Sequence, residues 1–236
     1  MHSAVKSLFA AALTTCVVYA APQSDTKKPG GAAPAARAGA EQRIDLAERL
    51  AAKTLRAVNR DVTKSEVRAD AIHMSEAEGN GVTWIEGTDF GEGTIELEIR
   101  GRDVLQRSFV GVAFHRSDDN TYECVYLRPF NFRATDPVRH QHAVQYITHP
   151  EFDWPRLRKE FPEEFENPVD ASVSPTDWVP LRVDVKGQTI QIFVGKVTSP
   201  TLEVRKLGKL DRGMIGLWTG NGSDGDFANV RITPMK

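Results

Sequence analysis

The sequence lacks the features that mark disulfide-rich domains and zinc-binding domains. It contains 2 cysteines among 236 residues, and only Cys124 lies beyond the apolar N-terminal stretch. A single cysteine cannot form an intramolecular disulfide, so the fold must be held together by its core. Cys124 sits in a strand-like segment, where we expect it to pack as a small hydrophobic side chain. No spacing of Cys and His typical of a zinc site is present.

Long apolar runs and excess charge are also scarce. No stretch after residue 21 is long and apolar enough to cross a bilayer, so we expect no transmembrane segment in the mature protein. The formal net charge is −2, with Lys and Arg intermixed with Asp and Glu. Neutralising phosphates requires a clustered excess of basic residues, so nucleic acid is not an expected partner.

Residues 1–20 have the pattern of a signal peptide. Lys6 supplies a positive start, residues 8–18 are apolar, and small residues precede Ala21. These features predict export to the periplasm or the exterior, with cleavage between Ala20 and Ala21. A lipoprotein site at Cys16 is not expected, because no small residue directly precedes this cysteine and the apolar run continues past it.

Residues 21–42 are rich in Ala, Pro, Gly and Lys, which predicts a flexible linker. Such a linker offers nothing on which a buried N-terminal helix, the alternative to a signal peptide, would pack. Residues 41–58 fit a helical period only loosely and are interpreted as a short helix running into a strand. We expect one domain over residues 43–236.

Beyond residue 61 the hydrophobic period changes to two, with turns rich in Gly, Asn and Asp between short alternating runs. This pattern predicts an all-β sandwich of two antiparallel sheets. The expected strands are 94–101, 107–116, 121–128, a hairpin over 178–195, 213–220 and 225–233. In the second of these, Val110, Val112 and Phe114 are expected to face the core, and the other face is expected to be open, with Gly111 and Ala113 on it.

The hairpin WVPLRVDVKGQTIQIFVG and the segment GMIGLWTGNGSDGDFANVRI resemble the closing strands of concanavalin A-like lectin and glucanase domains, including laminin G-like ones. The resemblance implies a jelly-roll sandwich that handles carbohydrate. Several segments, among them GTIELEIRG and HAVQYITHPEFDWPRLR, are also similar to exported bacterial proteins near the domain-of-unknown-function 1080 family. Some members of that group are named 3-keto-disaccharide hydrolases, but no mechanism transfers residue by residue.

Residues 128–177 show no clear strand pattern and form an insertion that is longer than an ordinary sandwich connection. The insertion mixes aromatic residues with Arg, Asn, Gln and His, the side chains that stack on sugar rings and bind hydroxyl groups. The predicted binding residues are Arg128, Asn131, Gln145 and Trp154, together with His115 on the same face and Tyr146 as a further stacking residue. In the alternative interpretation, the aromatic residues form a satellite core and the arginines pair with glutamates.

Histidines offer a catalytic alternative within the insertion. His140 and His142 stand two residues apart, and in an extended segment both imidazoles would point the same way. With Tyr146 as an acid and Arg128 as a charge neutraliser, they would suit a lyase-type proton abstraction. A histidine pair in a loop also serves as ordinary hydrogen-bonded structure, so this assignment depends on the four side chains lying together.

Carboxylates suggest two further sites. Glucanases of the superfamily carry three alternating acids on one strand, whereas this chain offers only Glu96 and Glu98, with Arg100 in the third place. Asp224 and Asp226 lie in an oxygen-rich loop that would suit calcium, although the same loop suits a Gly-rich turn. Glucanase chemistry is therefore not expected, and calcium is the only cofactor that we consider.

The sequence thus predicts an exported glycan-binding module whose partner is an oligosaccharide or polysaccharide. The first alternative is a glycoside hydrolase or lyase acting on an oligosaccharide or a 3-keto-glycoside. The second alternative is a laminin G-like domain that binds protein. Whether the chain is an enzyme is left open by the sequence.

Overall fold

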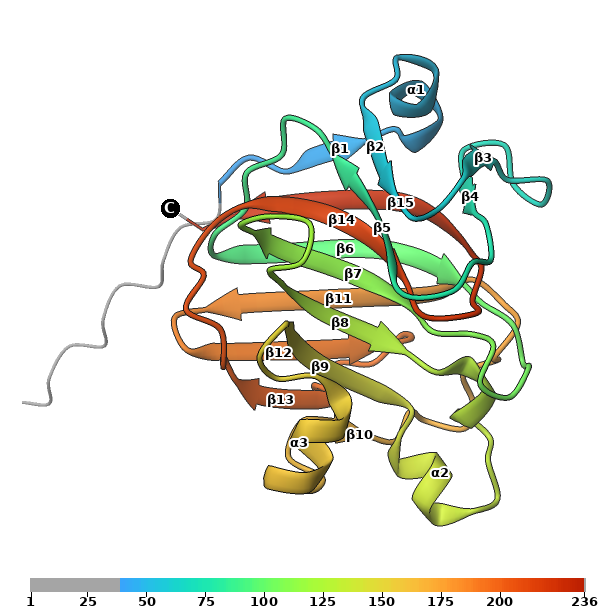
Figure 1. Cartoon of the computed structure of the whole chain (residues 1–236), viewed down its shortest axis with the longest axis vertical. Helices are drawn as coiled ribbons and strands as arrows, with labels where there is room; N and C mark the ends of the chain where they lie inside the picture. Colours follow the sequence, from blue (N-terminus) through green and yellow to red (C-terminus); the bar gives the residue numbers. More distant parts are fainter. Residues whose placement is uncertain (1–38, 236) are drawn as a thin grey trace, which may run out of the picture. The chain divides into compact units, whose positions relative to one another are not determined.

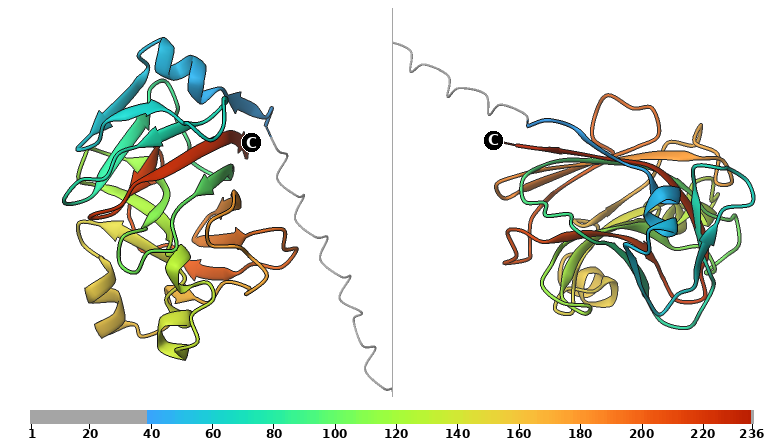
Figure 2. Two further views of the ribbon diagram at one scale, coloured as in Figure 1. Left: turned by 90° about the vertical axis from the view of Figure 1, so that its right-hand side faces the viewer. Right: turned by 90° about the horizontal axis from the view of Figure 1, so that it is seen from above.

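The computed structural model describes residues 39–235, which form two antiparallel sheets that we call sheet I and sheet II. The two layers of strands are visible in Figures 1 and 2. In spatial order, sheet I contains β13 (Leu202–Arg205), β12 (Thr189–Val194), β11 (Val179–Lys186), β6 (Gly93–Arg100), β15 (Gly225–Pro234), β4 (Ile72–Met74) and β3 (Val62–Lys64), with β1 (Gln42–Ile44) paired to β15. Sheet II contains β10 (Glu166–Asn167), β9 (Val144–His149), β8 (Tyr122–Leu127), β7 (Val110–Arg116), β14 (Met214–Thr219), β5 (Gly81–Ile85) and β2 (Leu55–Val58).

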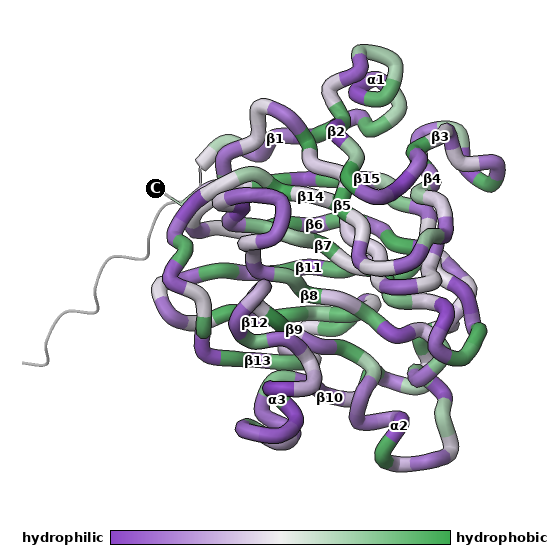
Figure 3. Tube along the Cα trace, in the orientation of Figure 1, coloured by the Kyte–Doolittle hydropathy of each residue, from purple (hydrophilic) through white to green (hydrophobic). Residues whose placement is uncertain are grey.

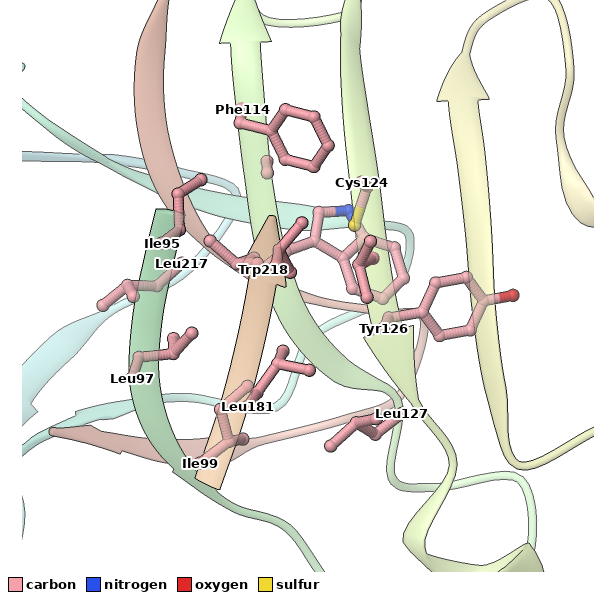
Figure 4. Close-up of a cluster of buried hydrophobic side chains, with 14 of the residues drawn as sticks. Ile95, Leu97, Ile99, Phe114, Cys124, Tyr126, Leu127, Leu181, Leu217 and Trp218 are labelled. Carbon is pink, nitrogen blue, oxygen red and sulfur yellow. The ribbon is translucent and has the colours of Figure 1, made fainter. Parts of the chain in front are cut away.

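Alternation along the strands places one face of each sheet in a shared core. In β6, Ile95, Leu97 and Ile99 are buried while the residues between them are partly exposed. Figure 4 shows these three side chains with Leu181 of β11 and Leu217 of β14. Each such side chain contributes roughly 1.5–3 kcal/mol to folding through its burial, so the core suffices without a disulfide.

Within residues 39–235, three short helices lie outside the sheets. The helix α1 (Leu46–Ala51) is at the opposite end of the sandwich from α2 (Pro137–Gln141) and α3 (Trp154–Glu160), as Figure 1 shows. A 3₁₀ turn, η1 (Pro129–Asn131), precedes α2. The residues of α3 are mostly hydrophilic (Figure 3). None of the helices in residues 39–235 is long and apolar enough to cross a membrane.

The expected all-β jelly-roll sandwich is confirmed, as is the hairpin with its turn at Gly187, where φ is +55°. The short helix running into a strand is confirmed by α1 and β2. The interpretation of residues 128–177 as an insertion without strands is wrong, because β9 and β10 extend sheet II through it.

The predicted signal peptide and residues 21–38 of the predicted linker lie outside the described residues. The last linker residues belong to the sandwich, because Gln42 pairs with Ile232 of β15 and the Gly39 amide donates to the Pro234 carbonyl.

Candidate functional site

The outer face of sheet II is covered by aromatic rings. Strand register places Gly111 opposite Tyr126, and Trp218 on the other side of Gly111. The Tyr126 and Trp218 rings are 4.9 Å apart, and Trp84 lies against Gly216, where a Cβ would come within 2.6 Å of the Trp84 ring. These three aromatic side chains are at most 3% exposed. The face that was expected to be open is therefore occupied by these aromatic side chains. Because the rings are buried, they pack against neighbouring residues and offer no exposed surface on which a sugar could stack.

Arg128 is the centre of a buried polar network on this face. Its Nη2 donates to the Tyr126 hydroxyl at 2.6 Å and to Gln145 Oε1 at 2.5 Å, and its Nη1 donates to the His142 carbonyl at 3.2 Å. Burial lowers the pKa of Arg128, although the guanidinium keeps its charge at neutral pH. Gln145 Nε2 is buried and has no hydrogen-bond partner among the described residues.

Glu166 carries the negative charge of this network. Its carboxylate is contacted by Arg158 at 3.0 Å, by His142 Nδ1 at 2.8 Å and by Arg128 at 3.8 Å. The pKa of His142 is lowered, because desolvation together with the nearby Arg158 and Arg128 outweighs the attraction of Glu166. His142 is therefore neutral at pH 7, and its Nδ1 lies 2.8 Å from the Glu166 carboxylate without hydrogen-bond geometry.

Trp154 brings an exposed aromatic ring to the network. It is the first residue of α3 and is 48% exposed. The guanidinium of Arg158, one helical turn further on, lies 4.9 Å from the centre of the Trp154 ring and also binds Glu166. Contacts thus join an exposed ring to a buried ion network. We call this group the Trp154 strip; its members are Trp154, Arg158, Glu166, His142, Arg128 and Gln145.

Two other predicted residues are structural neighbours of the strip. Asn131 is buried, donating to the His142 carbonyl at 3.0 Å and accepting from Arg139 Nε at 3.3 Å. His140 Nε2 lies 3.1 Å from the Val169 carbonyl oxygen. Both side chains fix the loop around α2 through these contacts.

Tyr146 and His115 lie elsewhere, inside the sandwich. Both contact the fully buried Glu123: the Tyr146 hydroxyl donates to its carboxylate at 2.6 Å, and His115 Nδ1 lies 3.0 Å from it. Lys206 Nζ is 3.7 Å from the same carboxylate. His115 was expected on the open face with Arg128, but its φ of +53° makes a bulge that turns it inward.

This separation contradicts the catalytic grouping of His140, His142 and Tyr146. Tyr146 belongs to the Glu123 cluster, whereas His142 belongs to the Trp154 strip and His140 is bound to a loop carbonyl. Successive residues of β9 point to opposite faces of sheet II, so Tyr146 cannot share a site with its neighbour Gln145. Acid–base chemistry by the three together is excluded by this geometry.

Asp224 and Asp226, the two acids considered for calcium, both form ion pairs. Asp224 lies 2.6 Å from Arg102 Nε, and Asp226 contacts His73 at 3.2 Å and Arg100 at 3.4 Å. Residues 39–235 contain no cluster of three or more His, Cys, Asp or Glu side chains able to hold a metal ion. In this structure the bases around them occupy both carboxylates, which favours the interpretation of the loop as a Gly-rich turn.

The aromatic residues of segment 128–177 mostly follow the satellite-core interpretation. Phe130, Phe132 and Phe165 are buried, and Phe152 and Phe161 pack against the core. The expected Arg–Glu pairing is also confirmed by Arg158–Glu166. Trp154 is the exception. The sequence gives no signal for the network, because Glu166, close to Glu163 and Glu164, resembles any surface glutamate.

Comparisons with known proteins show the fold. No protein-family model and no curated protein matches the chain. Among solved structures, a carbohydrate-binding module, CBM66, from Bacillus subtilis matches with a TM-score of 0.53 and 13% identity over 76% of this chain and 95% of the module. A Bacillus subtilis protein of unknown function with a galectin-like fold matches with a TM-score of 0.57 and 13% identity, over 86% and 100% of the two chains.

A third structure, the κ-carrageenase of Pseudoalteromonas carrageenovora in complex with an oligotetrasaccharide of κ-carrageenan, matches with a TM-score of 0.51. Its identity is 15% over 89% of this chain and 99% of the enzyme. Together these likenesses show the fold, a jelly-roll sandwich of two antiparallel sheets. The finer resemblance to the domain-of-unknown-function 1080 group stays a prediction.

Proposed function

We propose that this protein binds a carbohydrate through the Trp154 strip. The observation that carries the proposal is an exposed tryptophan ring in contact with a polar network. Trp154 is 48% exposed, and Arg158 links it to Glu166 and His142. Apolar C–H faces of sugars pack on aromatic rings, and charged or amide groups beside the ring bind the hydroxyl groups.

The fold class supports a carbohydrate ligand. The solved structures that resemble the chain include a carbohydrate-binding module and a carrageenase with a bound saccharide, both at low identity. Sandwiches of one fold host many functions, so the site itself must carry the argument. The Trp154 strip is the place where the sequence-predicted binding residues Arg128, Gln145 and Trp154 belong to one connected set of contacts.

Binding fits the strip better than glycoside cleavage. Hydrolysis by the usual mechanisms needs two carboxyl groups about 5–10 Å apart, one of them free to act as an acid. Glu166 is the single carboxylate of the strip, and its charge is neutralised by Arg158 and Arg128. The glycoside hydrolase or lyase alternative would therefore require a different site.

Replacing Trp154 tests the proposal. We expect Trp154→Ala to weaken binding to a responding oligosaccharide by about tenfold or more, because exposed aromatic anchors carry a large share of sugar-binding energy. Calorimetry against a panel of neutral and uronic oligosaccharides, including 3-keto-glycosides, provides the measurement.

Val138→Ala is the matched control for this test. Val138 is 64% exposed on α2, outside the strip, so its replacement should leave affinity unchanged. Equal affinity of the Trp154 variant and the wild type would remove the strip as the site, and new reducing ends or unsaturated sugars would establish an enzyme. Silence across the whole panel would favour a protein partner.

Export belongs to the same proposal, since free glycans and cell-surface polysaccharides are met outside the cytoplasm. It is supported by the sequence pattern of residues 1–20. Expression of the full chain in a bacterial host and mass measurement of the secreted or periplasmic product test it. A mature protein beginning at Ala21 is expected, and an uncleaved cytoplasmic product would contradict the proposal.

A further inference from the structure

A row of polar and aromatic side chains crosses the outer face of sheet I. Register pairs Phe193 with Arg182, Arg182 with Glu96, and Glu96 with Arg231. Arg43 of β1 pairs with Arg231 and ends the row. Directly opposed residues in neighbouring strands lie about 4.5–5.5 Å apart at Cβ, so the row is continuous across the strands β12, β11, β6, β15 and β1.

An irregularity in β15 opens this face. The register of β15 against β6 shifts between Ala228 and Arg231, and Asn229 within the shift has a φ of +52°. A β-bulge of this kind bends the strand and redirects a side chain. Asn229 Nδ2 consequently donates to Glu98 Oε2 at 2.6 Å, on the exposed side of the sheet.

Two hollows adjoin at the bulge. One has a volume of about 200 Å³, and its polar and aromatic lining comprises Phe193, Arg182, Glu96, Glu98, Asn229 and Arg231. The other, of about 340 Å³, is lined on its far side by Arg43, Asp45 and Asp70. Asn229 and Arg231 line both hollows. Because pockets for drug-sized ligands measure roughly 300–1,000 Å³, the first hollow suits a ligand of one small ring.

The charges of the first hollow balance. The hollow is lined by two carboxylates, Glu96 and Glu98, and two guanidiniums, Arg182 and Arg231. Glu96 lies in register between the two arginines, with Arg231 Nη2 3.6 Å from its Oε1, and Glu98 is paired with Arg68. A small anion would be repelled by the two carboxylates there, and a small cation would be repelled by the two guanidiniums. A neutral ligand is the one that this balance accommodates.

Hydrogen-bonding capacity remains in the hollow. The Nε–H groups of Arg182 and Arg231 are covered yet donate no hydrogen bond within residues 39–235. Arg182 Nε lies 3.4 Å from Asp184 Oδ2 without hydrogen-bond geometry, and the Arg182 guanidinium stacks 3.6 Å from the Phe193 ring centre. Donors and carboxylate acceptors thus stand side by side, which matches hydroxyl groups, since each hydroxyl both donates and accepts.

We infer that these hollows form a second carbohydrate site, which holds one neutral sugar ring against Arg182, Glu96 and Arg231. The larger hollow beyond Arg231 receives the next ring of a chain that runs across the strands. This site lies on sheet I and shares no residue with the Trp154 strip on sheet II. It has the ligand class of the proposed function without depending on that strip.

Titration of the full chain with methyl glycosides tests the inference. The probes are methyl β-D-glucopyranoside, methyl β-D-galactopyranoside and methyl α-D-mannopyranoside, with sodium glucuronate as the anionic comparison. Arginine Nε–H and tryptophan indole N–H resonances are followed by nitrogen-15 NMR. At least one neutral glycoside is expected to shift the Arg182 and Arg231 Nε–H signals, and glucuronate is expected to shift them less.

Variants assign the signal to the hollow. Arg182→Met keeps an apolar stem over Phe193 but removes the donors, so affinity should fall about tenfold or more, as expected for a lost charged hydrogen bond. Lys186→Met, on the same strand and face of β11 but outside the hollow, is the matched control and should bind like the wild type. Asn229→Gly removes the amide without straining the positive φ, and it replaces Arg182→Met if that variant fails to fold.

Each outcome separates the two sites. Shifts at Arg182 and Arg231 that persist in Trp154→Ala establish the hollow even if the strip binds nothing. Shifts confined to the Trp154 indole refute the hollow and leave the proposed function standing. Silence of both arginine signals with all three glycosides, tighter binding of glucuronate, or equal affinity of Arg182→Met and wild type would each overturn the inference.

Discussion

Glu123 has no exposed surface inside the sandwich, and three side chains satisfy its carboxylate. They are Tyr146, His115 and Lys206, at 2.6, 3.0 and 3.7 Å. Removing one charged member of a buried network leaves the others uncompensated, which costs roughly 3–5 kcal/mol. We therefore expect Glu123→Gln to lower the free energy of unfolding by about 3 kcal/mol, as measured by urea denaturation.

The control for Glu123 is Glu92→Gln, since Glu92 is exposed. This substitution should change the free energy of unfolding by less than about 0.5 kcal/mol. A loss at Glu123 no larger than the loss at Glu92 would show that the interior carboxylate is not held as an ion.

His149 gives the protein a pH dependence of known sign. Burial lowers the pKa of His149 below 6.5, against a smaller opposing effect of Asp153. The unfolded chain then binds a proton more readily than the folded chain, so stability is lost as the pH falls through and below about 6.5. We expect His149→Asn to flatten the dependence of the melting temperature on pH between about 7 and 5.

His73 provides the opposite case on the same molecule. Its hydrogen bond to Asp226 raises the pKa of His73 above 6.5. The stability that the His73–Asp226 pair contributes is fully present below pH 6.5 and is lost as the pH rises through the pKa of His73 in the folded state. His73→Asn should therefore change how the melting temperature depends on pH above about pH 6.5. If His149→Asn and His73→Asn change the melting temperature in the same pH range, the assigned directions of the two pKa shifts are wrong.

At the scale of elements, α3 presents Trp154, and Asp153 fixes where α3 begins. The Asp153 carboxylate accepts from the Arg156 amide at 3.2 Å. Loss of such a cap costs about 1 kcal/mol and frays the first turn. Because Trp154 is the first residue of that turn, we expect Asp153→Ala to weaken saccharide binding in calorimetry, while the fold survives in thermal denaturation.

The second capped helix of this region is the control for α3. Asp136 caps α2 in the same way, accepting from the Val138 amide at 2.8 Å and the Arg139 amide at 3.1 Å. Asp136→Ala should lose a similar amount of stability and keep its affinity for saccharide. An equal loss of affinity in both variants would mean that binding responds to stability in general and not to the position of Trp154.

The same elements show how far the sequence predicts the structure. β6 and β11 alternate apolar and polar residues because one face of each is partly exposed, and both were predicted. β9 was missed because its two faces are both covered, so five of its six residues are buried and no period of two remains. Burial on both faces is a property of the assembled sandwich and leaves no local signal.

Prediction of the site met a similar limit. Strand parity put Arg128 on one face with His115, and Arg128 lies beside Tyr126 on the outer face of sheet II. The Arg–Glu pairs of the segment, such as Arg158–Glu166, belonged to the alternative interpretation. Parity failed for His115, because its bulge resets the alternation and turns the ring inward. Bulges arise from packing between strands, and a histidine in a regular pattern gives no warning of one.

For the whole molecule, the two proposed sites lie on opposite outer faces of the sandwich. The Trp154 strip is built on sheet II, and the hollows beside Arg231 are built on sheet I. Packed sheets are separated by about 10 Å, with side chains filling the space between them. A single sugar ring cannot touch both sites, and the two sets of residues share no contact partner.

Independence of the two sites predicts stoichiometry and additivity. Native mass spectrometry with a methyl glycoside that binds both sites should show up to two sugars on the wild type, one on Trp154→Ala or on Arg182→Met, and none on the double variant. Losses of binding free energy at sites without shared partners add within a few tenths of a kcal/mol. The double variant should therefore lose the sum of the binding free energies that the two single variants lose. If one single variant abolished both binding events, the two sets of residues would have to form one site assembled from both sheets. The packing of side chains between the sheets leaves no room for a sugar to contact both sets, so we do not expect this result.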